Sequence, residues 1–156
     1  MDIKLLVMDV DGTLTDGCIY MGANGEMMKA FHCQDGPGIR RLLPKAGITP
    51  AILTGRSSHI VTQRAAEMGI THVYQGVDDK LPKLRWLAEE LGLTPDQIAY
   101  IGDDINDLDC IRYCGCTACP SDSAAEILPE VDYVCKRGGG RGAVREFIQW
   151  LLTTHT

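Results

Sequence analysis

The chain has 156 residues, of which 45% are hydrophobic and 23% are charged, and its formal net charge at pH 7 is −6. This length and composition predict one globular domain with a sizeable core. The acidic balance argues against a nucleic-acid partner, and every apolar run is too short to cross a membrane. Because the N-terminus has no signal-peptide pattern, we expect a cytoplasmic protein.

The first predicted element is a strand over Leu5–Met8, because a short aliphatic run fits a strand that is covered on both faces. Asp9 and Asp11 follow it, and buried carboxylates are costly unless they are paired or bind a cation. Such a pair indicates a cation site in which one carboxylate attacks and the other transfers a proton. Taken alone, the stretch is explained more simply by a strand followed by an Asp-Gly turn.

Residues 18–31 are predicted to form a projecting β-hairpin, because an Asn-Gly pair separates two extended runs. A loop over residues 32–38, rich in helix-breaking residues, follows the hairpin. It leads into a predicted helix over Ile39–Lys45, which Gly47 would close.

A second buried strand is predicted over Ala51–Leu53, with Thr54 and Gly55 at its carboxyl end. A helix follows and extends to about Met68. The first amides of such a helix are unpaired and its dipole favours negative charge, so this junction is a natural anion site. A plain N-capped helix would explain the two serines at its start but not the threonine.

Two more strands are predicted over His72–Tyr74 and Ile98–Ile101, with a helix over residues 80–91 between them. Lys80 in the first turn of that helix is unfavourable unless an anion lies nearby. Asp103 and Asp104 follow the fourth strand just as the first pair of aspartates follows the first strand.

The C-terminal third contains short predicted strands, a short helix and a long amphipathic helix. These elements cover Cys116–Ala118, Tyr133–Cys135, Ala124–Leu128 and Ala143–Leu152, and a glycine-rich loop with Arg141 precedes the last helix. Cys110, Cys114, Cys116 and Cys119 could be imagined as a zinc knuckle. Their spacing matches no standard pair of CxxC units, so we expect buried, unreactive and reduced thiols.

Strands and helices alternate throughout, which predicts an α/β fold with a doubly wound, Rossmann-like parallel sheet and helices on both faces. In such sheets ligands bind at the carboxyl ends of the strands. The special residues fall at that edge, namely Asp9, Asp11, Thr54, Lys80 and Asp103. Carboxylates with a lysine and a threonine suit a magnesium ion and a phosphoryl group.

Four stretches resemble the ordered motifs of the haloacid-dehalogenase phosphohydrolase superfamily: Asp9-Val10-Asp11-Gly12-Thr13, Leu53-Thr54-Gly55-Arg56, Lys80 and Gly102-Asp103-Asp104-Ile105-Asn106-Asp107. The resemblance implies that Asp9 is the nucleophile and Asp11 the general acid/base. It further implies that Thr54 and Lys80 bind the phosphoryl group. By the same resemblance Mg²⁺ is held by Asp9, Asp103 and the Asp11 carbonyl, with Asp104 and Asp107 as supporting acids.

The chain leaves no room for the cap domain usual in that superfamily, so we expect residues 1–156 to form one domain with the hairpin as its insertion. An uncapped chain of this kind resembles the 3-deoxy-D-manno-octulosonate 8-phosphate (Kdo8P) phosphatases. The matching stretches are Asp16-Gly17, residues 35–40, residues 74–77 and residues 139–146. The resemblance implies a role in lipopolysaccharide biosynthesis and a homotetramer in which the hairpins form a shared barrel and neighbouring subunits cover each active site.

Kdo8P carries a carboxylate, which the planar fork of an arginine suits well. The positions that the resemblance implies for substrate binding are His32, Asp35, Gly36, Arg40, Gly55, Arg56, Arg64 and Lys80. The loop departs from the family, which often has Asn-x-Arg where this chain has His32-Cys33-Gln34. Arg141 could reach a site in its own or in a neighbouring subunit.

Two other functions stay open at this point. One is a phosphatase for a nine-carbon sialic acid 9-phosphate, over the same motifs, although Arg56 favours the eight-carbon acid. The other is a non-catalytic oligomerisation domain like that of the cytidylyl-sialate synthetases. The second needs eroded motifs, whereas the motif residues are all present in this chain.

Overall fold

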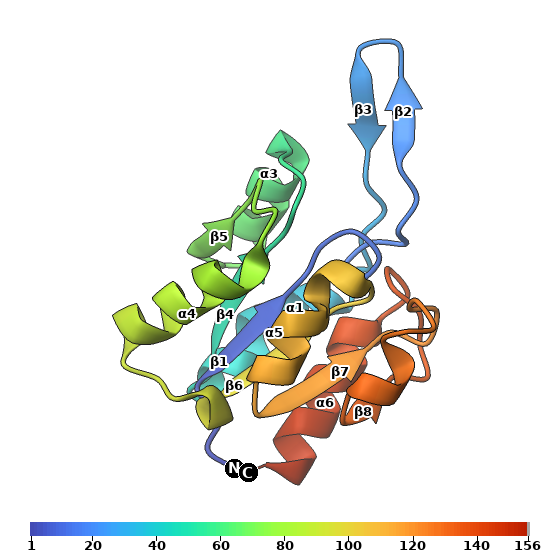
Figure 1. The fold of residues 1–156 in the computed structure, drawn as a ribbon. Coiled ribbons are helices and arrows are strands. Elements are labelled where there is room, and N and C mark those ends of the chain that lie inside the picture. Colours follow the sequence, from blue (N-terminus) through green and yellow to red (C-terminus); the bar gives the residue numbers. More distant parts are fainter. Residues whose placement is uncertain (156) are drawn as a thin grey trace.

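The computed structural model describes residues 1–155, and its centre is a six-stranded sheet (Figure 1). The strands are β1 (Leu5–Met8), β4 (Thr49–Leu53), β5 (His72–Tyr74), β6 (Ile98–Ile101), β7 (Cys116–Cys119) and β8 (Tyr133–Val134). They lie in the order β5-β4-β1-β6-β7-β8, and every neighbouring pair is parallel. The predicted parallel α/β sheet is therefore confirmed.

Helices cover both faces of the sheet, as Figure 1 shows. One face carries α1 (Asp35–Pro37), η1 (Gly38–Leu42), α2 (Leu43–Lys45), α3 (His59–Glu67) and α6 (Ala143–Thr154), and the other carries α4 (Lys80–Leu91) and α5 (Leu108–Tyr113). Alternate residues of β1 point to opposite faces, so Leu6 and Met8 join the first core and Leu5 and Val7 the second. Burial on both faces explains why this strand is a continuous apolar run.

The sheet topology brings the carboxyl ends of three strands together. β1 pairs with β4 on one side and with β6 on the other, so the strand order reverses here. Met8 lies opposite Ile52 and Ile101 in the two pairings. The residues that follow these strands therefore meet at the switch point, where open α/β sheets bind ligands.

The helix predicted over Ile39–Lys45 begins four residues earlier, at Asp35. The glycines of this stretch are typical of a loop, yet a Cβ on Gly38 would lie 3.0 Å from Arg145 Cδ, so the glycine lets α6 pack closely. The helix widens into a π turn over η1, where Leu43 donates its amide to the Gly38 carbonyl.

The helix predicted near Ala124–Leu128 is wrong. The chain forms successive tight turns there, in which Ile127 donates its amide to Ala124 and Glu130 to Ile127, and a short 3₁₀ helix, η4, covers Leu128–Glu130. Pro129 has no amide hydrogen, so it cannot continue an α-helical ladder in this segment.

The predicted hairpin is confirmed as β2 (Tyr20–Gly22) and β3 (Gly25–Met28), which project from the sheet (Figure 1). An isolated bridge between Thr15 and Phe31 closes its base. Two further 3₁₀ turns, η2 (Pro95–Gln97) and η3 (Ile105–Asp107), flank β6. Within residues 1–155, no helix has the length and apolar character needed to cross a membrane.

The cysteines are free, and four of them, Cys110, Cys116, Cys119 and Cys135, are buried in the core. Burial raises the pKa of the Cys110 and Cys116 thiols to about 12, so these groups stay protonated. Within the described residues, the one cluster of potential metal ligands consists of carboxylates rather than thiols.

Candidate active site

A buried ion pair between Asp9 and Lys80 lies at the centre of the strand edge. Asp9 follows β1, Lys80 begins α4, and Lys80 Nζ donates to Asp9 Oδ1 over 2.9 Å. Burial alone would lower the pKa of Lys80, but two neighbouring carboxylates outweigh it and raise the pKa. The lysine therefore stays charged, and these carboxylates explain why it is tolerated in a first helical turn.

The second partner of Lys80 is Asp107, which is fully buried. Its Oδ1 accepts hydrogen bonds from Lys80 Nζ over 2.7 Å and from the Tyr100 hydroxyl over 2.5 Å. Its Oδ2 accepts from the backbone amides of Asp103 and Asp104. Both oxygens are thus occupied by protein donors, which makes Asp107 an anchor for Lys80 and for the turn after β6.

Asp9 and Asp103 form the group that is free to bind a cation. Ligand oxygens of Asp9, Asp103 and Asp107 lie within 4.8 Å of one another. Burial and then repulsion by Asp107 raise the pKa of Asp9, and burial raises that of Asp103 to about 6. A bound cation would favour the ionised form of both carboxylates, and an all-oxygen donor set suits Mg²⁺.

Gly12 is required for the close approach of Asp103 to the first loop. It has φ +86°, and a Cβ there would lie 1.9 Å from Asp103 Oδ2. Thr13 donates from its hydroxyl to Asp103 Oδ1 over 3.3 Å. The glycine and threonine of the first motif therefore position the acid of the last one.

These groups open into a pocket of about 160 Å³. It is lined by Asp9, Asp11, Thr54, Gly55, Arg56, Asp103, Asp104 and Asn106. The acidic residues, Thr54 and Arg56 line a space suited to a phosphoryl group. Asp104 also caps the η3 turn, because its Oδ1 accepts from the Ile105 amide.

The structure does not bring all predicted substrate residues into this pocket. Gly36, Arg40 and Arg64 line a separate cavity of about 410 Å³. Asp35 is 1% exposed, and its Oδ1 accepts from the Arg145 amide in the first turn of α6. In this chain its contacts therefore join two helices.

Lys80 does not line the pocket either, because it is buried behind Asp9, and His32 and Arg141 also lie outside the lining. His32 accepts from the Gln34 amide through Nδ1, within the loop before α1. Arg141 has an exposed side chain on the glycine-rich loop. The roles predicted for His32 and Arg141 from the sequence therefore stay predictions.

Several functional candidates were missed from the sequence. Lys29 donates to Asp11 Oδ1 over 2.6 Å, Tyr100 holds Asp107, and Asn106 lines the pocket. Lys29 and Tyr100 belong to strand-like stretches. The pattern of such a stretch indicates strand pairing and burial, but not which polar side chain a residue contacts. Asn106 was part of the quoted motif, so its place after β6 was the one available signal.

Comparison with known proteins shows the family to which the chain belongs. Residues 37–115 match the family model described as haloacid dehalogenase-like hydrolase. The Kdo8P phosphatase KdsC of Escherichia coli K12 is 46% identical over 151 residues, which cover 97% of this chain and 80% of that protein. The chain belongs to the haloacid dehalogenase-like hydrolases.

Two solved structures of Kdo8P phosphatases are similar to this hydrolase over nearly its whole length. That of Moraxella catarrhalis, in complex with magnesium, phosphate and Kdo, is 44% identical with a TM-score of 0.92, covering 97% of this chain and 86% of its own. The cobalt-bound form from Haemophilus influenzae is 40% identical with a TM-score of 0.93, covering 97% and 88%. Within the hydrolases, the chain therefore belongs to the family of Kdo8P phosphatases.

Proposed function

We propose that this chain is a magnesium-dependent phosphatase that hydrolyses Kdo8P to Kdo and phosphate, as in lipopolysaccharide biosynthesis. The observation that carries the proposal is the pocket lined by Asp9 and Asp103, with Lys80 bound to Asp9 behind it, in a member of the Kdo8P phosphatase family. A pocket of about 160 Å³ suits the phosphoryl group, so the sugar acid extends outward past Arg56.

In the first step, a carboxylate oxygen of Asp9 attacks phosphorus and the bond to the sugar oxygen breaks. Asp11 lines the same pocket and donates a proton to that departing oxygen. The product on the protein is an aspartyl-phosphate. Lys80 and Thr54 hold the phosphoryl oxygens as negative charge spreads over them.

In the second step, Asp11 takes a proton from water, and the water oxygen attacks the phosphorus of the aspartyl-phosphate. The bond from phosphorus to Asp9 breaks, phosphate leaves, and both carboxyl groups return to their starting states. Each proton that Asp11 gives in the first step is regained in the second, so the cycle balances.

Asp9, Asp103 and the Asp11 backbone carbonyl would hold the Mg²⁺ ion. When bound, this ion offsets the repulsion between an anionic nucleophile and an anionic substrate. Asp107 serves this group indirectly, because within residues 1–155 its side-chain hydrogen bonds go to Lys80, Tyr100 and backbone amides.

The sugar-acid carboxylate is assigned to arginines. Arg56 is the best placed, since this residue lines the pocket and its side chain is 52% exposed. Arg40 and Arg64, with Gly36, form the cationic cavity beside the 32–36 loop and are proposed to serve a substrate held at a subunit boundary. The names of the relatives do not favour the nine-carbon substrate or the non-catalytic reading.

Assembly as a homotetramer through the hairpin is part of the proposal. Met21, Met27 and Met28 on β2 and β3 are 62%, 69% and 51% exposed, and among the described residues the two strands pair only with each other. An exposed apolar hairpin of this kind supports burial against other copies of the chain. We further propose one domain with this hairpin as its insertion, and a cytoplasmic location, which seven free cysteines fit.

The decisive experiment measures phosphate release from Kdo8P, from a nine-carbon sialic acid 9-phosphate and from simple sugar phosphates, with and without Mg²⁺. We expect strong selectivity for Kdo8P, dependence on Mg²⁺, and no release by Asp9→Asn. Faster phosphate release from the nine-carbon ester than from Kdo8P would show that the nine-carbon ester is the substrate. Absence of activity on every ester would favour an oligomerisation domain, and release that survives Asp9→Asn would refute the mechanism.

A further inference from the structure

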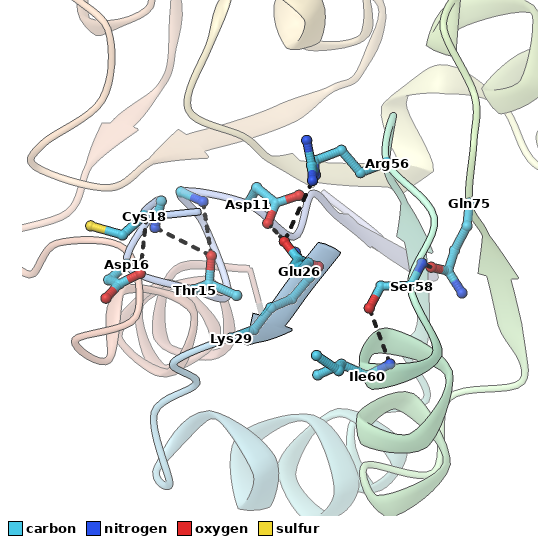
Figure 2. A network of polar contacts seen from close by, with 12 residues as sticks. Asp11, Thr15, Asp16, Cys18, Glu26, Lys29, Arg56, Ser58, Ile60 and Gln75 are labelled. Atoms are coloured by element: carbon cyan, nitrogen blue, oxygen red, sulfur yellow. Dashed lines mark hydrogen bonds and ion pairs between the residues drawn. The ribbon is translucent and has the colours of Figure 1, made fainter. Parts of the chain in front are cut away.

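A buried lysine at the base of the hairpin contacts the active site. Lys29 follows β3, and its side chain is only 1% exposed. Its Nζ donates to Asp11 Oδ1 over 2.6 Å and to Glu26 Oε2 over 3.1 Å. Figure 2 shows this group, in which residues from the hairpin reach across to the loop after β1.

Burying an ammonium group is costly unless carboxylates surround it. An apolar residue at this position would avoid that cost, and the β2–β3 ladder does not use the Lys29 side chain. We therefore look for the effect of the buried charge at Asp11, the carboxylate to which Lys29 donates its shorter hydrogen bond. The alternative is a purely structural role, in which Lys29 only stabilises the base of the hairpin.

The geometry restricts the Asp11 side chain. Its Oδ1 is occupied by Lys29, while Oδ2 has no hydrogen-bond partner within residues 1–155, and Asp11 lines the pocket. One carboxyl oxygen is thereby held and the other is left for proton transfer. Fixing a reacting group in this way contributes strongly to rate, because small displacements are costly.

Glu26 completes the network. It lies on β3, its side chain is 12% exposed, and its Oε2 also lies 3.6 Å from Arg56 Nη2. The carboxylate thus balances the charge of Lys29 and links the hairpin to the loop after β4 (Figure 2). The hairpin base therefore contacts both the proton-transfer group and the proposed substrate arginine.

We propose that Lys29 is a positioning residue of the reaction, which holds Asp11 with its free oxygen directed to the leaving group. The inference rests on the proposed function, because it assigns Asp11 the protonation of the sugar oxygen. A sugar alkoxide needs that proton, whereas p-nitrophenolate is stable enough to leave without it. Loss of this positioning should therefore slow hydrolysis of Kdo8P much more than hydrolysis of p-nitrophenyl phosphate.

The test compares kcat/KM for Kdo8P and for p-nitrophenyl phosphate, since this ratio reports the steps through departure of the leaving group. For Lys29→Met we expect kcat/KM to fall about 100-fold on Kdo8P and no more than about 5-fold on p-nitrophenyl phosphate. Lys4→Met is the matched control, because Lys4 lies at the opposite end of β1 in an exposed pair with Asp2. It should change neither value.

A second variant covers the case in which Lys29→Met fails to fold. Glu26→Gln combined with Lys29→Met removes one charge of each sign. Its control is Glu26→Gln alone, which disturbs the Arg56 contact in the same way, and relative to that control the double variant should show the same unequal loss. Equal losses on both esters, or unchanged values, would overturn the positioning role. If the wild-type protein hydrolysed neither ester, the proposed function would fail instead, so the two failures are distinguishable.

Discussion

Lys80 lies between Asp9 and Asp107 and is 2% exposed, so its charge is balanced almost entirely by protein groups. In the proposed mechanism Lys80 also contacts a phosphoryl group bound at Asp9. Under that proposal the same residue contributes both to the stability of the strand edge and to the charge that the site offers to its substrate.

Replacing Lys80 with Met should lower both activity and stability. The variant loses a donor to the phosphoryl oxygens, which should reduce kcat by about 100-fold or more. It also leaves two buried carboxylates without their cation, which should cost about 3–5 kcal/mol in the free energy of unfolding. Steady-state kinetics and urea denaturation measure the two effects.

Lys45→Met, on the exposed end of α2, is the matched control and should leave both quantities nearly unchanged. A Lys80→Met protein with wild-type stability would contradict the charge balance described for the site.

At the scale of elements, Asp35 joins α1 to α6. Its Oδ1 accepts from the Arg145 amide, while Oδ2 is buried without a partner within the described chain. Burial raises the pKa of Asp35 to about 6, although the Arg145 amide and nearby cations oppose the shift. The contact of the two helices should therefore depend on pH.

Because the pKa of Asp35 is higher in the folded state than in the unfolded chain, its contribution to stability is full below about pH 4. It is lost as pH rises through about 6. Asp35→Asn cannot ionise but keeps an acceptor oxygen. The stability of the variant relative to wild type should therefore increase between pH 4 and pH 7, by up to roughly 3 kcal/mol.

Urea denaturation at several pH values measures this difference. Asp78→Asn, in an exposed loop, is the control and should follow the wild-type curve. A difference between Asp35→Asn and wild type that does not change with pH would show that the buried carboxyl does not titrate in this range.

At the scale of the whole molecule, Mg²⁺ should stabilise the fold, because its ligands come from β1 and β6 and meet only in the folded chain. At an ion concentration 100 times the Kd, the expected gain is about 2.7 kcal/mol. A thermal melt with increasing Mg²⁺ measures it. Asp103→Asn should remove most of the rise in Tm, whereas Asp109→Asn on the exposed side of α5 should not.

Assembly is the other property of the whole molecule. Met21→Glu combined with Met27→Glu places charges on the exposed hairpin without touching the core. Light scattering after gel filtration should show a tetramer for wild type and smaller species for the double variant, because buried like charges oppose association. A double variant that stays tetrameric would exclude the hairpin as the interface.

The sequence by itself determined the fold class and the edge at which the site lies. Parallel strands have the same direction, so residues that follow buried runs, such as Asp9, Thr54 and Asp103, must gather at one edge. Local sequence patterns, namely apolar runs and the residues that follow them, were sufficient to predict the fold class and this edge. They misled where a glycine served close packing, as at Gly38, and where Pro129 prevented a helix.

Only the tertiary structure decided which side chains contact one another. Lys80 and Asp9 are separated by 71 positions and Asp35 and Arg145 by 110, and nothing in their local patterns records these pairs. Lys29 was part of a strand in the sequence and became a partner of Asp11 only when the hairpin folded back. The physical reason is that periodicity reports which face is buried, whereas a hydrogen bond depends on where two distant backbones bring their side chains.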